Sequence, residues 1–192
     1  MRISHTHKFI FYSNPKSGSE SLRQMLDSYS DIKDVLYKNR SKENPFYSHI
    51  PPNEMKEIFE DRGWEYKDYY KIITVRNPYE RLYSLYKMIY RNRLLKPDYY
   101  KWLISTDNCG KGALQFGYSS MARKFGSYSL ENLIFSESGE NLVDSVIKLD
   151  DLDSEVEVLR KKLGIREKLI PPKINVRSDG KLLSEVYCKK SI

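Results

Sequence analysis

Cysteine is scarce in this chain of 192 residues: Cys109 and Cys188 are the only two, and they lie far apart. There is no CxxC motif or Cys/His cluster, so the sequence predicts no structural metal. Two such cysteines indicate reduced thiols rather than a disulfide. Apolar runs are short, and none approaches the roughly 20 residues that cross a bilayer. The N-terminal residues also lack the apolar core of a secretion signal. We therefore expect a cytoplasmic protein without a membrane span.

Positive charge dominates the composition: 33 Lys and Arg outnumber 26 Asp and Glu, which gives a net charge of +7. A basic surplus attracts anions, and nucleic acid, a phosphorylated nucleotide and an acidic polysaccharide would all satisfy it. The 16 tyrosines offer rings that stack on sugars or bases, although many will serve as half-buried packing residues. Hydrophobic residues make up 40% of the chain, which predicts one globular domain over residues 1–192.

A strand followed by a loop and a helix occurs twice in the first half of the chain. The apolar run 8–13 predicts a buried strand, and the helical spacing of apolar residues after it predicts a helix from near Ser19. A second β-rich run covers 69–75. It is followed by a helix over 78–91, which has a proline in its first turn, where proline is favoured.

The second half is less regular. A third strand is predicted at 145–149, followed by a helix over 152–163 that ends at Gly164, and a short helix is predicted at 53–60. Further short helices are predicted at 99–104, 119–125 and 182–187. Strands that alternate with helices predict an α/β fold, a single domain whose central parallel β-sheet is flanked by helices.

The first loop, Pro15–Ser21, has the features of a phosphate-binding loop. Gly18 allows the backbone to come close to a ligand, Lys16 adds a positive charge, and the following helix directs its N-terminal N–H groups toward the loop. Three serines provide hydroxyl donors: Ser17, Ser19 and Ser21. The lysine precedes the glycine, so this is not a Walker A loop. The alternative is an ordinary strand-to-helix turn with an exposed lysine.

The second strand leads into the segment Val75–Tyr86, VRNPYERLYSLY. Arg76 follows the carboxyl end of the strand, where open parallel sheets bind ligands, and its planar guanidinium suits phosphate oxygens. Ser84 lies eight residues further on, so both side chains can face one phosphate if the chain bends between them. Alternatively, Arg76 and Arg81 pair with carboxylates and Ser84 is a helix-surface residue.

Together, the segments PKSGSES and VRNPYERLYSLY resemble the sulfotransferase superfamily, and in style its carbohydrate sulfotransferases and their bacterial relatives. Residues 146–152 and 173–178 fit that family more weakly. The resemblance implies a P-loop-like nucleotide-binding sulfotransferase fold that uses PAPS (3′-phosphoadenosine 5′-phosphosulfate) as donor and releases PAP, without a metal. It places Arg76 and Ser84 at the 3′-phosphate. The residues it places at the 5′ side of the donor are Lys16, Ser17, Gly18, Ser19 and Ser21.

The implied reaction is an in-line displacement at sulfur, in which Lys16 stabilises the leaving group. His49 is the expected general base, because its ordinary pKa lies near working pH and related carbohydrate sulfotransferases place a histidine in this region. The alternative is that His49 only packs before the next helix, with Glu54 and Glu57 as fallback bases. Glu20 departs from the family pattern, and we expect it to point away from the phosphate or to pair with a cation such as Arg23 or Lys16.

Three other functions stay open. A P-loop kinase or NTPase requires a Walker A loop, and a nucleic-acid-binding module requires a recognisable RNP, zinc-finger or helix-turn-helix pattern, which the sequence lacks. A non-enzymatic relative could keep the fold without catalysis. Under the sulfotransferase interpretation the acceptor bears a hydroxyl group. A carbohydrate is preferred, and a small alcohol or a peptide tyrosine stays open. Acceptor specificity is expected in the loops 37–52 and 92–141. The oligomeric state is not predicted.

Overall fold

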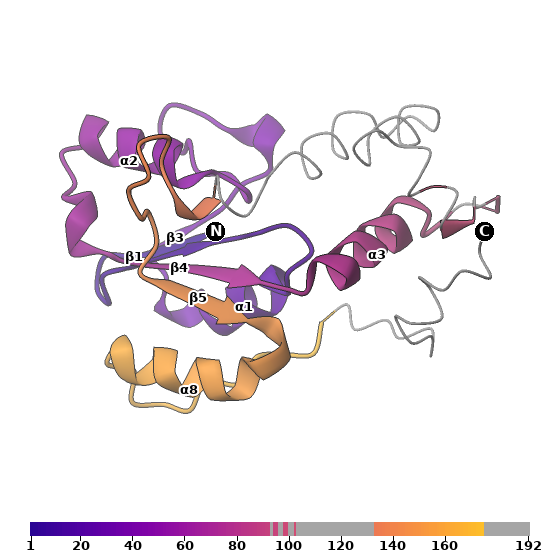
Figure 1. The fold of residues 1–192 in the computed structure, drawn as a ribbon. Coiled ribbons are helices and arrows are strands. Elements are labelled where there is room, and N and C mark those ends of the chain that lie inside the picture. The colour runs from indigo at the N-terminus through magenta and orange to yellow at the C-terminus, as the bar shows by residue number, and fades with distance from the viewer. Residues whose placement is uncertain (93, 96–97, 100–101, 103–132, 175–192) are drawn as a thin grey trace. The chain divides into compact units, whose positions relative to one another are not determined.

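The structure, a computed structural model, describes residues 1–92, 94–95, 98–99, 102 and 133–174 (Figure 1). The chain divides into two compact units. The first comprises Met1–Arg76 and Glu131–Asn175, and the second comprises Asn77–Leu130 and Val176–Ile192. Each unit is described separately below. The single domain over 1–192 stays a prediction.

The first unit is built on a five-stranded sheet with the order β3-β1-β2-β4-β5. The strands are β1 (Arg2–Ser4), β2 (Phe9–Tyr12), β3 (Ile32–Lys33), β4 (Tyr70–Val75) and β5 (Ser145–Lys148). β2, β4 and β5 are parallel, with Tyr12 paired to Ile73 and Val75 paired to Lys148. The α/β class and the three predicted strands are confirmed.

The sheet is mixed, however, and the prediction of a parallel sheet missed its other edge. β1 pairs antiparallel with both β2 and β3. β1 has only three residues, one of them the charged Arg2, so it shows no apolar run. The turn from Ser4 to Phe9 contains no glycine; Lys8 adopts a positive φ of 50° instead. His5, between β1 and β2, is half-buried, and its Nδ1 lies 2.5 Å from the Tyr69 hydroxyl.

Helices cover both faces of this sheet (Figure 1). α1 (Ser19–Met25) and α8 (Leu152–Lys162) lie on one face, and α2 (Pro52–Asp61) lies on the other. The first face forms the main core, in which Phe9, Phe11 and Ile72 pack against Leu22 and Leu159. Four 3-10 helices complete the unit: η1 (Asp27–Tyr29), η2 (Tyr37–Asn39), η3 (Tyr66–Asp68) and η4 (Leu149–Asp151). Alternate strand residues thus face opposite helical layers, as the strand period of two requires.

The helices predicted at 53–60 and 152–163 are confirmed as α2 and α8. Gly164 follows α8 with a φ of 64°, the left-handed conformation expected at a helix C-terminus. The helices predicted at 119–125 and 182–187, and most of the one at 99–104, lie outside the described residues.

The second unit contains α3 (Pro78–Ile89), which confirms the helix predicted from Pro78. The Asn77 side chain caps the helix by accepting a hydrogen bond from the backbone N–H of Tyr79 at 3.0 Å. Leu85 and Ile89 form its buried face and pack with three aromatic residues, namely Tyr90, Tyr99 and Trp102. Within the described ranges, no helix of either unit is long and apolar enough to span a bilayer.

Candidate functional site

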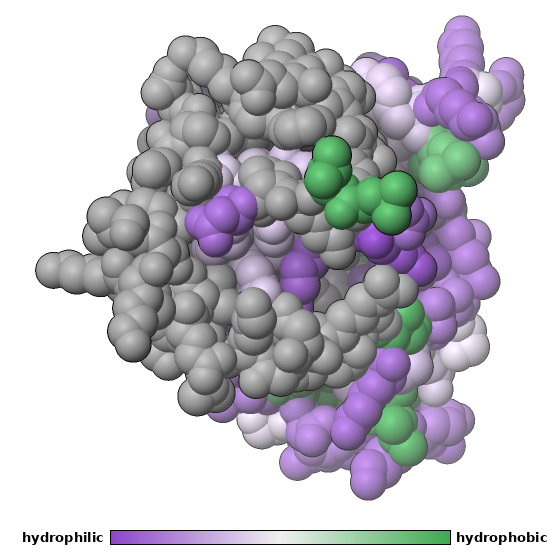
Figure 2. Space-filling model, turned by 90° about the vertical axis from the view of Figure 1, so that its right-hand side faces the viewer, coloured by the Kyte–Doolittle hydropathy of each residue, from purple (hydrophilic) through white to green (hydrophobic). Residues whose placement is uncertain are grey.

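The carboxyl ends of three parallel strands bring three loops to one edge of the first unit's sheet (Figure 1). Residues 13–18 follow β2, Arg76 follows β4, and η4 follows β5. In the view from this side, the described residues that are visible around the grey atoms are largely hydrophilic, with a few hydrophobic groups among them (Figure 2). Open α/β sheets bind ligands at this edge, because crossover connections leave a crevice there. Six of the predicted site residues lie here: Lys16, Ser17, Gly18, Ser19, Ser21 and Arg76.

The backbone of the first loop has an uncommon conformation. Lys16 has a φ of 64° and Gly18 has a φ of 71°, whereas Ser17 between them is not in the positive region. A lysine in the left-handed region is uncommon and strained; such strain clusters at functional sites, although Lys8 shows it in the β1–β2 turn as well. Alternation of this kind turns successive backbone N–H groups toward one side, which forms a concave anion-binding surface. The two positive φ values are therefore compatible with anion binding by this loop, which stays a prediction.

Gly18 has a second constraint that the sequence did not reveal. A Cβ atom added to it would lie 2.5 Å from Cδ1 of Leu149, the first residue of η4. We expected the glycine to admit a ligand; the described contact is with a side chain from η4, which follows β5, two strands along the sheet from β2. Leu149 therefore helps to set the position of the loop.

A hydrogen bond joins the ends of the two central strands. Asn14 donates its side-chain N–H to the carbonyl of Thr74 at 2.9 Å, and both residues are buried. Among the described residues, the buried oxygens Asn14 Oδ1, Ser17 Oγ and Thr74 Oγ1 have no hydrogen-bond partner. An unpartnered buried polar group costs about 1–3 kcal/mol, which a ligand that supplies a partner would recover. Sequence reasoning missed Asn14, although its position directly after a strand was a usable signal.

Lys16 and Arg76 lie close enough to influence each other. Burial lowers the pKa of Lys16, and the positive charge of Arg76 lowers it further. Two cations at adjacent strand ends repel each other, and an anion between them would reverse this effect. Lys16 and Arg76 therefore lie near each other at one edge of the first unit's sheet, and their roles at a donor stay predictions.

His49 lies beside the start of the same loop. Its Nδ1 is 2.7 Å from the carbonyl oxygen of Ser13, the residue after β2. A carbonyl only accepts hydrogen bonds, so Nδ1 carries the proton and the neutral ring keeps its lone pair on Nε2. Burial lowers the pKa of His49 to about 4, although the hydrogen bond to Ser13 raises it. The imidazole is therefore neutral at neutral pH and has a nitrogen able to accept a proton.

Ser19 and Ser21 lie in the first turn of α1 and are nearly buried. Glu20, between them, forms an ion pair with Arg23 one turn later. This contact confirms one of the two pairings expected for Glu20 and directs the carboxylate to the helix surface. The unusual residue in the loop therefore has a local partner.

The other predicted residues are distributed differently. Ser84 lies in the middle of α3 and belongs to the second unit, so its role beside Arg76 stays a prediction. Glu54 accepts a hydrogen bond from the Tyr47 hydroxyl at 2.6 Å, and Glu57 is exposed on α2. The contact of Glu54 is compatible with a structural role, and the exposure of Glu57 with a solvated helix face.

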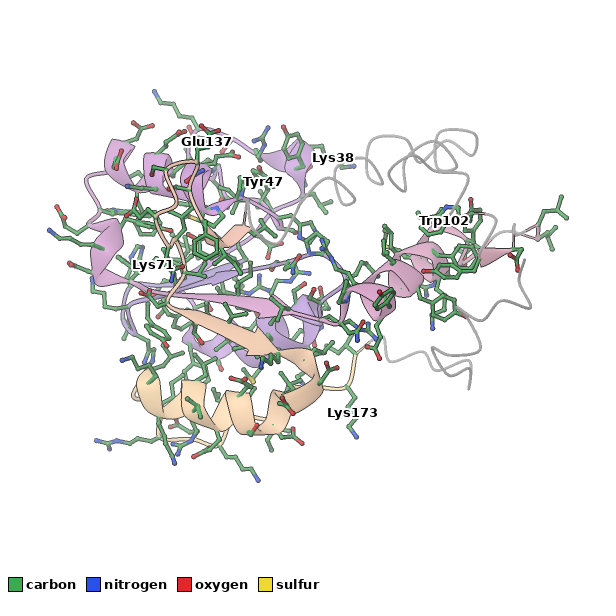
Figure 3. All side chains as sticks on the ribbon, in the orientation of Figure 1. Lys38, Tyr47, Lys71, Trp102, Glu137 and Lys173 are labelled. Carbon is green, nitrogen blue, oxygen red and sulfur yellow. The ribbon has the colours of Figure 1, made fainter. Side chains whose placement is uncertain are left out.

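A separate cavity of about 540 Å³ lies near the start of β4. Its lining includes Lys56 of α2, Trp64, Tyr66 and Lys71, the last of which is labelled in Figure 3. None of the predicted site residues lines it. It lies toward the amino end of β4, whereas the predicted residues gather at the carboxyl ends of the parallel strands.

Comparison with known proteins gives one match. A family model described as "Sulfotransferase family" matches residues 1–123, a range that includes both sequence motifs and His49. Neither a curated protein nor a solved structure matches the chain.

Proposed function

Because this chain belongs to the sulfotransferase family, we propose that it transfers a sulfuryl group from PAPS to a hydroxyl group of a carbohydrate. Sulfotransferase activity in general follows from the family. The donor, the acceptor class, the histidine base and a P-loop-like fold are the finer parts of the proposal. They rest on the residues at the carboxyl edge of the sheet.

The observation that carries the proposal is the pair of cations at adjacent strand ends. Burial and the positive charge of Arg76 lower the pKa of Lys16, which lies in the loop after β2 beside the positive φ of Gly18. A nucleotide with phosphates at both its 5′ and 3′ positions would bind one cation with each charged edge. A site that makes contacts with a 3′-phosphate rejects nucleotides without one, because its polar groups would then be left unpaired.

The described residues fit such a donor. Lys16, Ser17 and Gly18 would hold its 5′ side, together with the first turn of α1, which carries Ser19 and Ser21. Arg76 would hold the 3′-phosphate, joined by Ser84 of the second unit. The unpartnered Ser17 hydroxyl supports this fit, because a buried donor without a partner is costly and a phosphate oxygen would accept its hydrogen bond.

The transfer needs positioning and charge stabilisation from the protein rather than a covalent intermediate. His49 Nε2 takes the proton of the acceptor hydroxyl as its oxygen bonds to sulfur. Lys16 stabilises the negative charge on the bridging oxygen as the bond from sulfur to that oxygen breaks, and PAP leaves. With a pKa of about 4, His49 is neutral over the whole neutral range, but it is a weaker base than a histidine whose pKa lies near working pH, so its role as base rests on its position beside the loop.

Binding measurements test the nucleotide part of the proposal. Titration calorimetry with PAP and with ATP should show tighter binding of PAP. Lys16→Ala and Arg76→Ala should each weaken PAP binding by about 10- to 100-fold, the range expected when a hydrogen bond to a charged group is lost. Lys161→Ala is the matched control, because it removes the same charge from the exposed end of α8. Tighter binding of ATP, as a kinase would show, contradicts the proposal.

Transfer measurements test the chemistry. Radiolabelled PAPS with a panel of carbohydrates, small alcohols and tyrosine peptides identifies the acceptor class. His49→Ala and Lys16→Ala should both transfer label far more slowly than wild type. If Lys16→Ala transfers label at the wild-type rate, the loop is not the donor site.

A further inference from the structure

A buried carboxylate lies next to the proposed base. Asp34 follows β3, and its side chain is only 6% exposed. It forms ion pairs with Arg2 and with Arg23, whose Nη1 lies 2.6 Å from Asp34 Oδ2. The Ser48 hydroxyl donates a hydrogen bond to the same Oδ2. Asp34 is therefore the centre of a charged network that the proposed chemistry does not use.

Ser48 connects this network to the candidate site. Arg23 Nη1 also donates to Ser48 Oγ at 3.2 Å, so the serine is held by both members of the Asp34–Arg23 pair. The next residue is His49, whose ring contacts Ser13 at the end of β2. Arg23 belongs to α1, the helix that begins at the phosphate-binding loop, and it also pairs with Glu20 in the first turn. One network thus joins the base segment to the loop's helix.

The segment that carries Ser48 and His49 is a turn that is not part of a helix or a strand. The Ile50 N–H donates to the Tyr47 carbonyl across this turn at 3.3 Å, and the Met1 amino group donates to the Ser48 carbonyl at 3.1 Å. The Ser48 side chain adds its contacts with Asp34 and Arg23. Burial raises the pKa of Asp34, but the Met1 amino group, the Ser48 hydrogen bond, Arg23 and Arg2 lower it to about 2. The carboxylate is thus ionised at neutral pH, where it can keep its contacts with Arg23 and Ser48.

We propose that Asp34, acting through Ser48 and Arg23, is a positioning residue that holds the His49 imidazole against the end of β2. The inference rests on the proposed function, since it assigns His49 the role of base. A base must lie within hydrogen-bond reach of the proton that it takes, and a misplacement of 1 Å can cost about 100-fold in rate.

Ser48→Ala is the least disruptive test, because it leaves the Asp34–Arg23 ion pair in place. We expect kcat to fall by about 10- to 100-fold, with an unchanged KM for PAPS. Ser48→Thr keeps the hydroxyl and should restore the rate. Asp34→Asn should reproduce the loss seen with Ser48→Ala. Asp27→Asn is the matched control. Asp27 of η1 also forms an ion pair with Arg2, but through Nε rather than through the Nη1 that contacts Asp34. The Asp27→Asn variant should therefore keep the wild-type kcat.

An NMR measurement gives a readout that does not depend on activity. In ¹⁵N-labelled wild type, the His49 ring should show the Nδ1-protonated tautomer that the Ser13 contact requires. In Ser48→Ala the ring should show a mixture of both tautomers, and in Ser48→Thr the single tautomer should return. A merely structural role would lower the melting temperature without changing the tautomer.

The possible results separate this inference from the proposed function. If His49→Ala is inactive while Ser48→Ala keeps the wild-type kcat and tautomer, the positioning role is wrong and the base assignment stands. If Ser48→Ala loses only melting temperature, the network is structural and the inference is again wrong. If wild type neither binds PAP nor transfers sulfuryl, the proposed function fails. In that case the His49 tautomer in Ser48→Ala still tests the network: a mixture of tautomers supports the positioning role, and the single wild-type tautomer contradicts it.

Discussion

Gly18→Ala should destabilise the protein through two separate effects. The first is conformational: an alanine at a φ of 71° lies in the left-handed region, at a cost of about 1–2 kcal/mol. The second is steric: the new Cβ would lie 2.5 Å from Leu149 Cδ1, so that side chain must move. Leu149 is half-buried and can partly yield, which puts the clash near the lower end of the overpacking range, at about 1 kcal/mol.

Gly164→Ala isolates the first effect. Gly164 has nearly the same φ, 64°, but an added Cβ would meet nothing within 4 Å. Both substitutions also stiffen the unfolded chain, which offsets about 0.4–1 kcal/mol in each case. The net loss should therefore be about 1 kcal/mol for Gly164→Ala and about 2 kcal/mol for Gly18→Ala.

Urea unfolding followed by circular dichroism measures the difference. With a slope of about 2 kcal/mol per molar urea, the midpoint should fall by about 0.5 M for Gly164→Ala and by about 1 M for Gly18→Ala. A double-mutant cycle with Leu149→Ala should recover the steric part, since that change removes the atoms in the clash. Equal midpoints for the two glycine variants, with no coupling to Leu149, would refute the close packing of η4 on the loop.

Two further predictions concern the base and the second unit. His49 should titrate by NMR with a pKa near 4, well below its ordinary 6.5, because burial disfavours the charged ring. Between about pH 4 and 6.5, His49 then binds more protons in the unfolded state than in the folded state. The free energy of unfolding of wild type should therefore decrease as the pH falls through this window. The decrease should be smaller for His49→Ala, which lacks this group. A pKa near 6.5 would show that the ring is exposed. Asn77→Ala should cost about 1 kcal/mol through loss of the α3 cap, whereas Asn77→Ser should cost little, as thermal unfolding can check.

Local patterns in the sequence predicted much of the fold. The apolar runs gave β2, β4 and β5, and the helical periodicity, with Pro78 and Gly164 at the expected ends, gave α3 and α8. These signals lie in consecutive residues, so no tertiary information is needed to detect them. β1 was missed because three residues with one apolar side chain carry no detectable period.

The sequence by itself determined which residues follow the parallel strands, and so which charges and hydroxyls gather at one edge of the sheet. Lys16 and Arg76 were predicted there because parallel strands end on the same side. Only the tertiary structure decided which side chains support them. Leu149 against Gly18 and Asp34 against Ser48 join residues that are distant along the chain. No local pattern encodes such contacts, because they arise from the packing of separate elements against one another.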